Sequence, residues 1–328
     1  MTLNEIRALI HTDIQATDQL ILQRLASDVL LINQIGQYII NNGGKRLRPL
    51  MVLLSARACD PDHTHPSLQS NHHHLRAAVI EFIHTSTLLH DDVVDESDTR
   101  RGQKTANEVW GNAASVLVGD FLYSRSFEMM VEPGVLRIMQ VMSEATNVIA
   151  EGEVLQLLNC RDANTDEARY MDVIHRKTAK LFEAAARMGP VLTQQTQFEQ
   201  AFAQYGRHLG AAFQLIDDVL DYTASADDLG KNIGDDLAEG KPTLPLIYAM
   251  QHGTAEQKQI IQRAIETEGI NLLNEVSEII QTSGAIEFTR QKAHDEAALA
   301  KQALADTVDS DYKQALLALA DLAVNRNH

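Results

Sequence analysis

Apolar residues recur at intervals of three and four positions along most of the chain, and strand-like alternation of apolar and polar residues is almost absent. A clear example is the stripe from Leu20 to Ile39, which ends at a break around Asn41. This spacing places the apolar side chains on one face of an α-helix. Ala, Leu, Gln and Glu, which favour helices, are abundant. The sequence therefore predicts an all-α fold.

Breaks in the pattern predict where the helices begin and end. Residues 1–41 are expected to form one short and one longer helix that carry no chemistry. Pro49 can occupy the first turn of the next helix, because proline is tolerated there. Later breaks fall near Gly284 and Asp309. Further helices are expected at about 50–58, 75–96, 113–130, 136–158, 166–188 and 198–222, with three or four more between 254 and 325.

Two polar stretches separate these helices. Residues 60–74 contain the run His72-His73-His74. Adjacent side chains point in different directions, so we expect a solvated loop here rather than a metal site. Residues 98–105 are expected to form a polar turn. No stretch has the composition of an interdomain linker, so residues 1–328 are predicted to form a single domain.

An acidic group follows one strongly apolar stretch. Asp91, Asp92 and Asp95 stand at positions i, i+1 and i+4 after the apolar residues 80–89. On a helix this spacing gathers the three carboxylates on one short arc, where like charges repel. A solvated acidic face is the ordinary alternative for such a run. Partial burial beside an apolar stretch favours instead a group that needs a counter-cation.

The same spacing recurs in Asp217, Asp218 and Asp221, again within an apolar stretch. Two such triplets are much stronger evidence than one. With no His or Cys at ligand spacing nearby, facing carboxylates suit a hard divalent cation. Mg²⁺ in particular is usually held by a few carboxylates together with substrate phosphates. The sequence therefore predicts a magnesium site that binds a phosphate or diphosphate.

Basic residues stand at several breaks of this otherwise acidic chain. Lys45 and Arg48 fall at a predicted helix start, where free N–H groups and the helix dipole favour an anion. Arg100 and Arg101 follow the first acidic triplet about one helical turn later, and an arginine fork suits phosphate oxygens. The other candidates are Lys177 on a helix, and Lys231 and Lys241 in a glycine-rich loop at 227–243.

Composition narrows the class of protein. Lys and Arg total 28 against 45 Asp and Glu, giving a formal net charge of −17 that argues against a nucleic-acid-binding surface. Cys59 and Cys160 cannot form a disulfide framework and are expected to be small apolar residues in a reducing compartment. Neither a signal peptide nor an apolar run long enough to span a bilayer is recognisable. We expect a cytoplasmic protein that does not span a membrane.

These motifs together resemble the trans-isoprenyl diphosphate synthase family, and among its members most of all the bacterial octaprenyl diphosphate synthases. The resemblance runs from about Asn41 to Pro245, and the final third matches only as generic helices. It implies an all-helical domain around a deep central cavity, paired as a homodimer. The motifs that carry it are Gly43-Gly44-Lys45-Arg46-Leu47-Arg48-Pro49, Asp91-Asp92-Val93-Val94-Asp95, Arg100-Arg101-Gly102, Lys177-Thr178, Gln214 with Asp217-Asp218-Val219-Leu220-Asp221, and Gly230-Lys231 through Lys241-Pro242.

The resemblance also implies roles for individual residues. Asp91, Asp95 and Asp217 would bind Mg²⁺, about two or three ions in all, with Asp92, Asp218 and Asp221 supporting them. Lys177 and Lys231 would assist catalysis. The residues implied for the allylic diphosphate are Arg100, Lys177, Thr178, Gln214, Lys231 and Lys241. Those implied for the diphosphate of isopentenyl diphosphate are Gly44, Lys45, Arg48, His84 and Arg101, although a histidine on an apolar helix is often a core residue.

The implied reaction is a Mg²⁺-dependent, sequential condensation of isopentenyl diphosphate onto an allylic diphosphate such as farnesyl diphosphate, which supplies a quinone side chain. Positively charged groups that bind the leaving diphosphate would help the allylic C–O bond to ionise. Small residues before the first acidic triplet predict an open tunnel and a long product. The residues implied in chain length are Ile80, Ile83, Ser86 and Thr87.

Several alternatives remain at this point. A synthase of shorter or other chain length would carry the same motifs. A class I terpene cyclase would have an Asn/Ser/Glu triplet in place of the second aspartate triplet and no need for Lys45 and Arg48. A non-catalytic partner subunit would lack some of the aspartates, and every one is present. No EF-hand loop occurs, which excludes a simple calcium-binding protein of that type.

Overall fold

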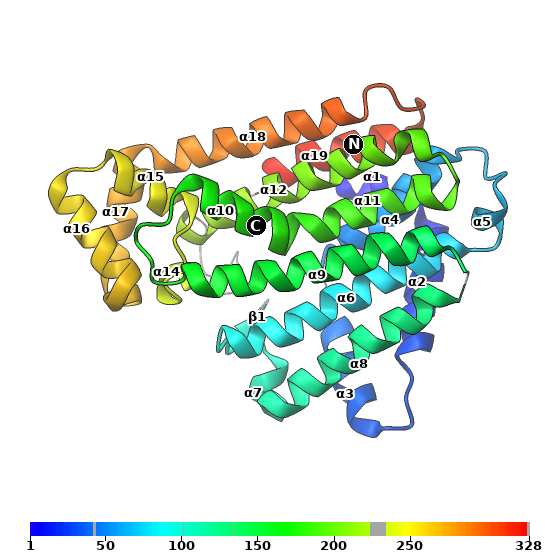
Figure 1. Cartoon of the computed structure of the whole chain (residues 1–328), viewed down its shortest axis with the longest axis horizontal. Coiled ribbons are helices and arrows are strands. Elements are labelled where there is room, and N and C mark those ends of the chain that lie inside the picture. Colours follow the sequence, from blue (N-terminus) through cyan, green and yellow to red (C-terminus); the bar gives the residue numbers. More distant parts are fainter. Residues whose placement is uncertain (42–43, 101, 133, 224–233, 327–328) are drawn as a thin grey trace. The chain divides into compact units, whose positions relative to one another are not determined.

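The computed structural model describes residues 1–41, 44–100, 102–132, 134–223 and 234–326. Helices account for nearly all of the regular structure in these residues (Figure 1), so the all-α prediction is confirmed. By its internal contacts the chain divides into two compact units. The first comprises residues 1–144, 181–206 and 303–319, and the second comprises residues 145–180, 207–302 and 320–328.

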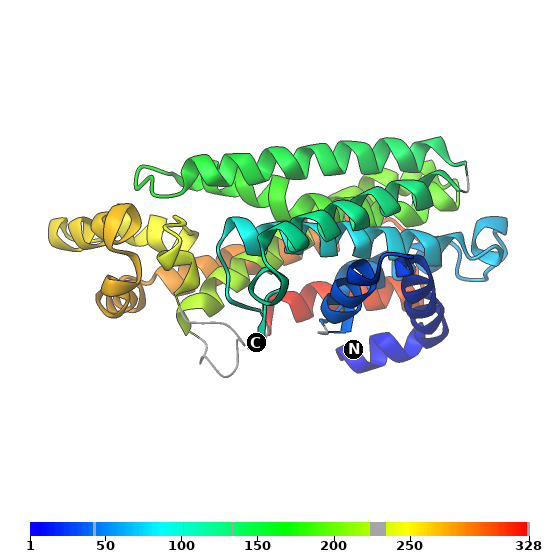
Figure 2. The same cartoon turned by 90° about the horizontal axis from the view of Figure 1, so that it is seen from below.

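The first unit is built around α6, which is buried along most of its length. Figures 1 and 2 show α6 lying alongside α8, and α4 and α2 also pack against it. A helix that is apolar on most sides requires such all-round cover. Its elements are α1 (Leu3–Leu9), α2 (His11–Leu25), α3 (Leu30–Asn41), α4 (Leu47–Cys59), α5 (Pro66–Gln69), α6 (His72–Val94), β1 (Thr99–Arg100), β2 (Gln103–Lys104), α7 (Ala106–Trp110), α8 (Asn112–Val131), most of α11 (Lys180–Leu192), η2 (Thr196–Phe198), and the first parts of α9 (Leu136–Asn159), α12 (Glu199–Thr223) and α19 (Asp311–Val324).

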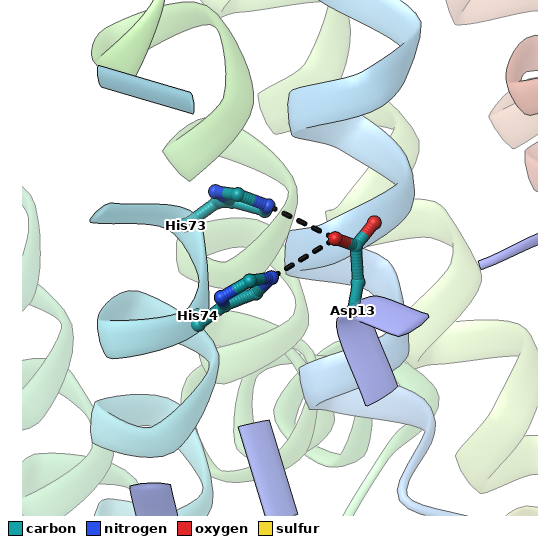
Figure 3. A group of neighbouring side chains, drawn as sticks. All are labelled: Asp13, His73 and His74. Atoms are coloured by element: carbon teal, nitrogen blue, oxygen red, sulfur yellow. Dashed lines mark hydrogen bonds and ion pairs between the residues drawn. The ribbon is translucent and has the colours of Figure 1, made fainter. Parts of the chain in front are cut away.

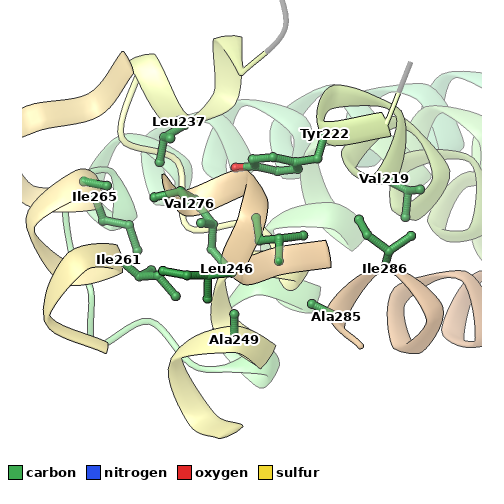
Figure 4. Close-up of a cluster of buried hydrophobic side chains, with 13 residues drawn as sticks. Val219, Tyr222, Leu237, Leu246, Ala249, Ile261, Ile265, Val276, Ala285 and Ile286 are labelled. Carbon is green, nitrogen blue, oxygen red and sulfur yellow. The ribbon is translucent and has the colours of Figure 1, made fainter. Parts of the chain in front are cut away.

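The second unit surrounds the end of α12, where the second acidic triplet lies. Figure 4 shows its apolar core, in which Val219 and Tyr222 of α12 pack among Leu246, Ile261 and Val276. Its elements are the ends of α9, α12 and α19, together with α10 (Glu167–Val173), η1 (Ile174–Ala179), α14 (Asp235–Ala238), α15 (Leu244–His252), α16 (Ala255–Arg263), η3 (Ala264–Glu268), η4 (Gly269–Leu272), α17 (Leu273–Ser283) and α18 (Ala285–Ala303).

One prediction of local structure was wrong, and another lacked a detail that the structure supplies. Residues 1–41 form three helices instead of two, because the side chain of Asn33 exchanges hydrogen bonds with the backbone of Ser27 (3.0 and 2.7 Å) between α2 and α3. The polar turn at 98–105 contains a two-stranded antiparallel ladder in which Thr99 pairs with Lys104. Gly102, at φ 72°, supplies the left-handed conformation that closes it.

The prediction of a solvated loop at His72–His74 was also wrong. α6 begins at His72, and His73 and His74 are buried. Both rings point at Asp13 of α2 (Figure 3), whose Oδ1 lies 3.3 Å from Nε2 of His73 and 2.9 Å from Nε2 of His74. Arg57 of α4 donates to both oxygens of the same carboxylate, at 2.7 and 2.5 Å. The buried acceptor comes from a distant part of the chain, which the local sequence cannot reveal.

Candidate active site

The first acidic triplet ends α6, and its central residue is the buried one. Asp92 is 1% exposed, whereas Asp91 and Asp95 are partly exposed. The Arg100 guanidinium donates to Asp92 Oδ1 through Nε at 2.8 Å and Nη2 at 2.7 Å. Burial raises the pKa of Asp92 while Arg100 opposes that rise. The first triplet therefore lies at the end of a helix as predicted, and Arg100 contacts its central carboxylate.

The second acidic triplet lies at the end of α12 and repeats this arrangement with different partners. Asp218 is 2% exposed and accepts hydrogen bonds from the Tyr170 hydroxyl and from Gln214 Nε2, the latter at 2.8 Å. Burial, followed by the charge of Asp236, raises its pKa well above the usual range. Asp221 is fully buried, and its Oδ2 accepts from the backbone N–H of Asp236 at 3.3 Å. Both of these donors to Asp218 are neutral.

Asp217 is the most exposed carboxylate of this triplet. Its side chain is 38% exposed, and its Oδ1 lies 2.6 Å from Nη2 of Arg326, just beyond α19. The outer carboxylate is therefore accessible while the inner two are enclosed.

The predicted residues Thr178 and Gln214 join the second triplet. Thr178 Oγ1 donates to Gln214 Oε1 at 3.0 Å, and Gln214 in turn donates to Asp218. Thr178 and Lys177 lie on the π-helical turn η1, which approaches α9 so closely that a Cβ on Gly152 would stand 2.7 Å from the Lys177 backbone nitrogen. Such π-turns occur frequently at functional sites.

Two predicted lysines of the second unit, Lys177 and Lys241, are paired with acidic residues. Lys177 Nζ lies 2.6 Å from Glu153 Oε2, and Lys241 pairs with Glu239. Arg101 and Lys231 lie outside the described residues.

The basic segment before α4 has the predicted place at a helix start. Arg46 is the N-cap, with a left-handed backbone at φ 44°, and Gly44 is exposed. Arg48 Nη1 lies 3.3 Å from Nε2 of His84, and its guanidinium stacks 4.3 Å from the centroid of the Phe182 ring. His84 is thus a polar partner of Arg48.

Beside this segment the first unit contains a cavity of about 620 Å³. Lys45 and Arg46 line it together with Arg7, whose Nη2 donates to the Lys45 carbonyl at 3.0 Å. Its walls otherwise include apolar residues such as Leu50 and Leu53. Lys45 therefore borders a hollow that combines basic and apolar groups.

The residues implied in chain length lie along α6. Ile80 and Ile83 are fully buried, and Thr87 is partly buried with its hydroxyl donating to the His84 carbonyl at 2.9 Å. Ser86 faces α8 instead, because its hydroxyl donates to the Gly119 carbonyl at 2.8 Å. Thr87 and Ser86 thus occupy different faces of the helix.

The donor chemistry of the two triplets fits Mg²⁺. Each triplet offers carboxylate oxygens, the ligand type that a hard cation prefers, and each keeps at least one carboxylate partly exposed. The cluster of Asp13, His73 and His74 has mixed ligand types that suit softer metals. Because Arg57 already contacts both Asp13 oxygens, a divalent cation there would bury further positive charge. We interpret that cluster as structural.

Sequence reasoning missed two partners of the second triplet. Tyr170 fits the apolar pattern of its helix, and nothing in the sequence indicates that its hydroxyl reaches Asp218, although a buried tyrosine usually finds a hydrogen-bond partner. Arg326 follows a generic amphipathic helix. The only signal for it is the general need of an acidic cluster for positive charge.

The comparison with protein families decides the identity of this fold. The polyprenyl synthetase model matches residues 29–282. The chain belongs to the polyprenyl synthetase family. It is 54% identical to the octaprenyl diphosphate synthase of Escherichia coli K12 over the full length of both chains. It is 45% identical to an all-trans-nonaprenyl-diphosphate synthase of Rhodobacter capsulatus, covering 98% of this chain and 97% of the relative.

Solved structures agree with this family. A crystal structure of polyprenyl synthase from Caulobacter crescentus CB15, complexed with calcium and isoprenyl diphosphate, matches with a TM-score of 0.94 at 43% identity. The match covers 100% of this chain and 98% of that one. The predicted family, fold class and prenyltransferase activity are therefore confirmed. No helix in the described residues is sufficiently long and apolar to cross a membrane.

Proposed function

We propose that this polyprenyl synthetase makes octaprenyl diphosphate by adding isopentenyl diphosphate units to an allylic primer such as farnesyl diphosphate. The observation that carries the proposal is the repeated aspartate triplet, with its central carboxylate buried and an outer one accessible. Full-length identity of 54% to an octaprenyl diphosphate synthase supports the product length. The nonaprenyl relative makes a neighbouring chain length the second candidate.

The two triplets are assigned as the metal ligands of this reaction. Asp91, Asp95 and Asp217 are the proposed Mg²⁺ ligands, and buried Asp92 and Asp218 position the helix ends that carry them, with Asp221 beside them. When bound, Mg²⁺ draws electron density from the departing diphosphate. We assign about two or three ions, because each triplet offers its own set of oxygens.

The allylic diphosphate is assigned to the residues around the triplets. Arg100 is anchored to Asp92 through one oxygen, and its fork keeps further donors for phosphate oxygens. Thr178 and Gln214 form a hydrogen-bonded pair that orients polar groups beside Asp218. The full proposed set is Arg100, Lys177, Thr178, Gln214, Lys231 and Lys241.

The diphosphate of isopentenyl diphosphate is assigned to the start of α4. Its N-terminal N–H groups and the charges of Lys45 and Arg48 attract an anion there. Contact between His84 and Arg48 holds the guanidinium in place. The full proposed set is Gly44, Lys45, Arg48, His84 and Arg101.

The chemical step follows from these assignments. The allylic C–O bond breaks as basic residues stabilise the leaving diphosphate. The double bond of isopentenyl diphosphate then attacks the allylic carbocation, forming the new C–C bond, and a proton passes to the departed diphosphate. Holding both substrates together makes the encounter effectively unimolecular. Apolar residues along α6, including Ile80 and Ile83, exclude the water that would quench the cation.

A product assay tests this proposal. The full-length protein is incubated with farnesyl diphosphate, labelled isopentenyl diphosphate and Mg²⁺, and the dephosphorylated products are resolved by chain length. A C40 product that needs Mg²⁺ is expected. A major product of another length would favour the second candidate, and a hydrocarbon released without consumption of isopentenyl diphosphate would favour a cyclase. No product at all would leave only a non-catalytic role.

We also propose that the enzyme is a homodimer. Apolar side chains on α8 are exposed in the single chain, including Leu117 and Val131 at 66% and 60%. A second copy of the chain is the occupant expected for such a helix face. Light scattering after gel filtration tests this, with Leu117→Asp expected to shift the protein toward monomer.

We propose a cytoplasmic location and a role in supplying a quinone side chain. Neither Cys59 nor Cys160 forms a disulfide, which suits a reducing compartment. Cell fractionation tests the location, and quinone analysis of cells depleted of the protein tests the role.

A further inference from the structure

Arg326 makes an unusual set of contacts near the end of the chain. Its side chain is 12% exposed, and its guanidinium carbon lies 3.8 Å from the centroid of the Phe213 ring. Nη2 donates to the Phe213 carbonyl at 2.6 Å and pairs with Asp217 Oδ1 at 2.6 Å. Phe213 and Asp217 stand one turn apart on α12. Nη2 of Arg326 therefore bridges the Phe213 carbonyl and one carboxylate oxygen of Asp217.

The contact leaves the guanidinium incompletely satisfied. Nε of Arg326 is buried and has no hydrogen-bond partner among the described residues. A buried donor without an acceptor lowers stability. An arginine that served stability alone would therefore be expected to have an acceptor for its Nε. Asp217 meanwhile keeps more than a third of its side chain exposed. The pair combines an enclosed cation with an accessible anion.

The surroundings of the pair are strongly acidic. Asp217, Asp218 and Asp221 share the end of α12, and the backbone of Asp236 contacts Asp221. Asp218 is balanced only by neutral donors, Tyr170 and Gln214, among its hydrogen-bond partners in the described chain. Arg326 thus brings positive charge to Asp217 within this acidic group.

We propose that Arg326 is the counter-ion of Asp217 in the metal-free enzyme and that a divalent cation displaces it when it binds Asp217. This inference rests on the proposed role of Asp217 as a metal ligand. Metal binding at this triplet is then an exchange of one cation for another, with no covalent change. Arg326 competes with the metal and stabilises the protein in its absence.

Two effects of removing the arginine follow. In Arg326→Gln the metal no longer displaces a bound cation, so its affinity rises, while the metal-free protein loses the ion pair and melts at a lower temperature. Arg326→Lys keeps the positive charge and stays near wild type in both. The matched control is Lys301→Gln, because Lys301 forms an exposed ion pair with Asp321 of α19 at 2.6 Å.

The experiment measures Mn²⁺ binding to the full-length protein from the electron paramagnetic resonance signal of free Mn²⁺, without diphosphate, alongside thermal melting in chelator. Arg326→Gln is expected to bind Mn²⁺ about three- to tenfold more tightly than wild type. Lys301→Gln is expected to match wild type. In an Asp217→Asn background the gain from Arg326→Gln is expected to disappear.

The outcomes separate this inference from the function on which it rests. Asp217→Asn could bind Mn²⁺ more weakly than wild type while Arg326→Gln leaves the affinity unchanged or lowers it. In that case the displacement proposal is overturned and the metal role of Asp217 survives. If Asp217→Asn binds Mn²⁺ like wild type, the metal assignment itself fails, and this inference fails with it.

Discussion

Two buried carboxylates in this molecule, Asp13 and Asp218, have opposite electrostatic surroundings. In the first unit Asp13 accepts hydrogen bonds from Arg57, His73 and His74, and these donors drive its pKa far below the usual range in spite of burial. In the second unit burial drives the pKa of Asp218 upward, because its donors are neutral and Asp236 is close. Burial is common to both, and the partners decide the result.

The difference separates the cluster that we interpret as structural from the proposed metal site. Around Asp13 the chain supplies the positive charge itself, and the cluster joins α2, α4 and α6. Around the second triplet the hydrogen-bond donors of Asp218 in the described chain are neutral, and Arg326 pairs with Asp217, whose side chain stays 38% exposed. An accessible carboxylate beside buried ones suits a cation from solution, as the proposed Mg²⁺ site requires.

The largest expected effect is on turnover. Asp217→Asn and Asp91→Asn should each lower kcat by about 10²- to 10³-fold, because each removes leaving-group stabilisation. Helical content should not change, since removing one of several like charges relieves repulsion. Steady-state kinetics and circular dichroism measure the two properties. Near-native turnover in either variant at saturating Mg²⁺ would remove that residue from the metal site.

Asp13→Asn should show the reverse pattern. Loss of the carboxylate leaves the buried Arg57 charge unpaired, so the free energy of unfolding should fall by about 3 kcal/mol. Turnover per folded molecule should remain close to wild type, because no substrate group is assigned there. Urea denaturation followed by assay of the folded fraction checks both. Loss of turnover with unchanged stability in Asp13→Asn would contradict the structural role of Asp13.

Thr87→Phe tests whether the proposed product tunnel runs along α6 in the first unit. An isoprene unit is comparable to one helical turn, roughly 5 Å, so a ring at position 87 should stop the tail after few additions. The main product should shift to about C15 to C20 with condensation retained. Ser86→Phe should act less strongly, because Ser86 faces α8. A parental long chain from Thr87→Phe would place the tunnel along another helix.

The smallest expected effect is on the pH dependence of stability. Burial lowers the pKa of His73 below its ordinary value. The unfolded chain therefore takes up this proton first, so stability is lost as pH falls below about 6.5. His73→Gln should flatten the fall in unfolding free energy between pH 7 and pH 5. An unchanged slope in chemical denaturation would show that folding does not change the pKa of His73.

The sequence predicted the parts of this structure that depend on local spacing. The helices carrying both triplets and the helix start after Lys45 follow from periodicity and breaks in it. The family resemblance placed Thr178 and Gln214 at one site, and their side chains do meet. Partners separated by long stretches of chain were not predictable. Tyr170 and Asp218, like Asp13 and His73, meet only because their helices pack together. The burial of His73 and His74 was missed for this reason.

Binding of metal together with a substrate analogue tests the central claim most directly. Mn²⁺ and farnesyl thiodiphosphate, which resists ionisation, are added together, and bound metal is counted by equilibrium dialysis for wild type, Asp91→Asn, Asp217→Asn and Asp13→Asn. The account predicts that each acidic-triplet variant loses at least about one bound ion and binds the analogue more weakly, while folded Asp13→Asn matches wild type. Equal metal counts in wild type and both triplet variants, or a loss confined to Asp13→Asn, would contradict it.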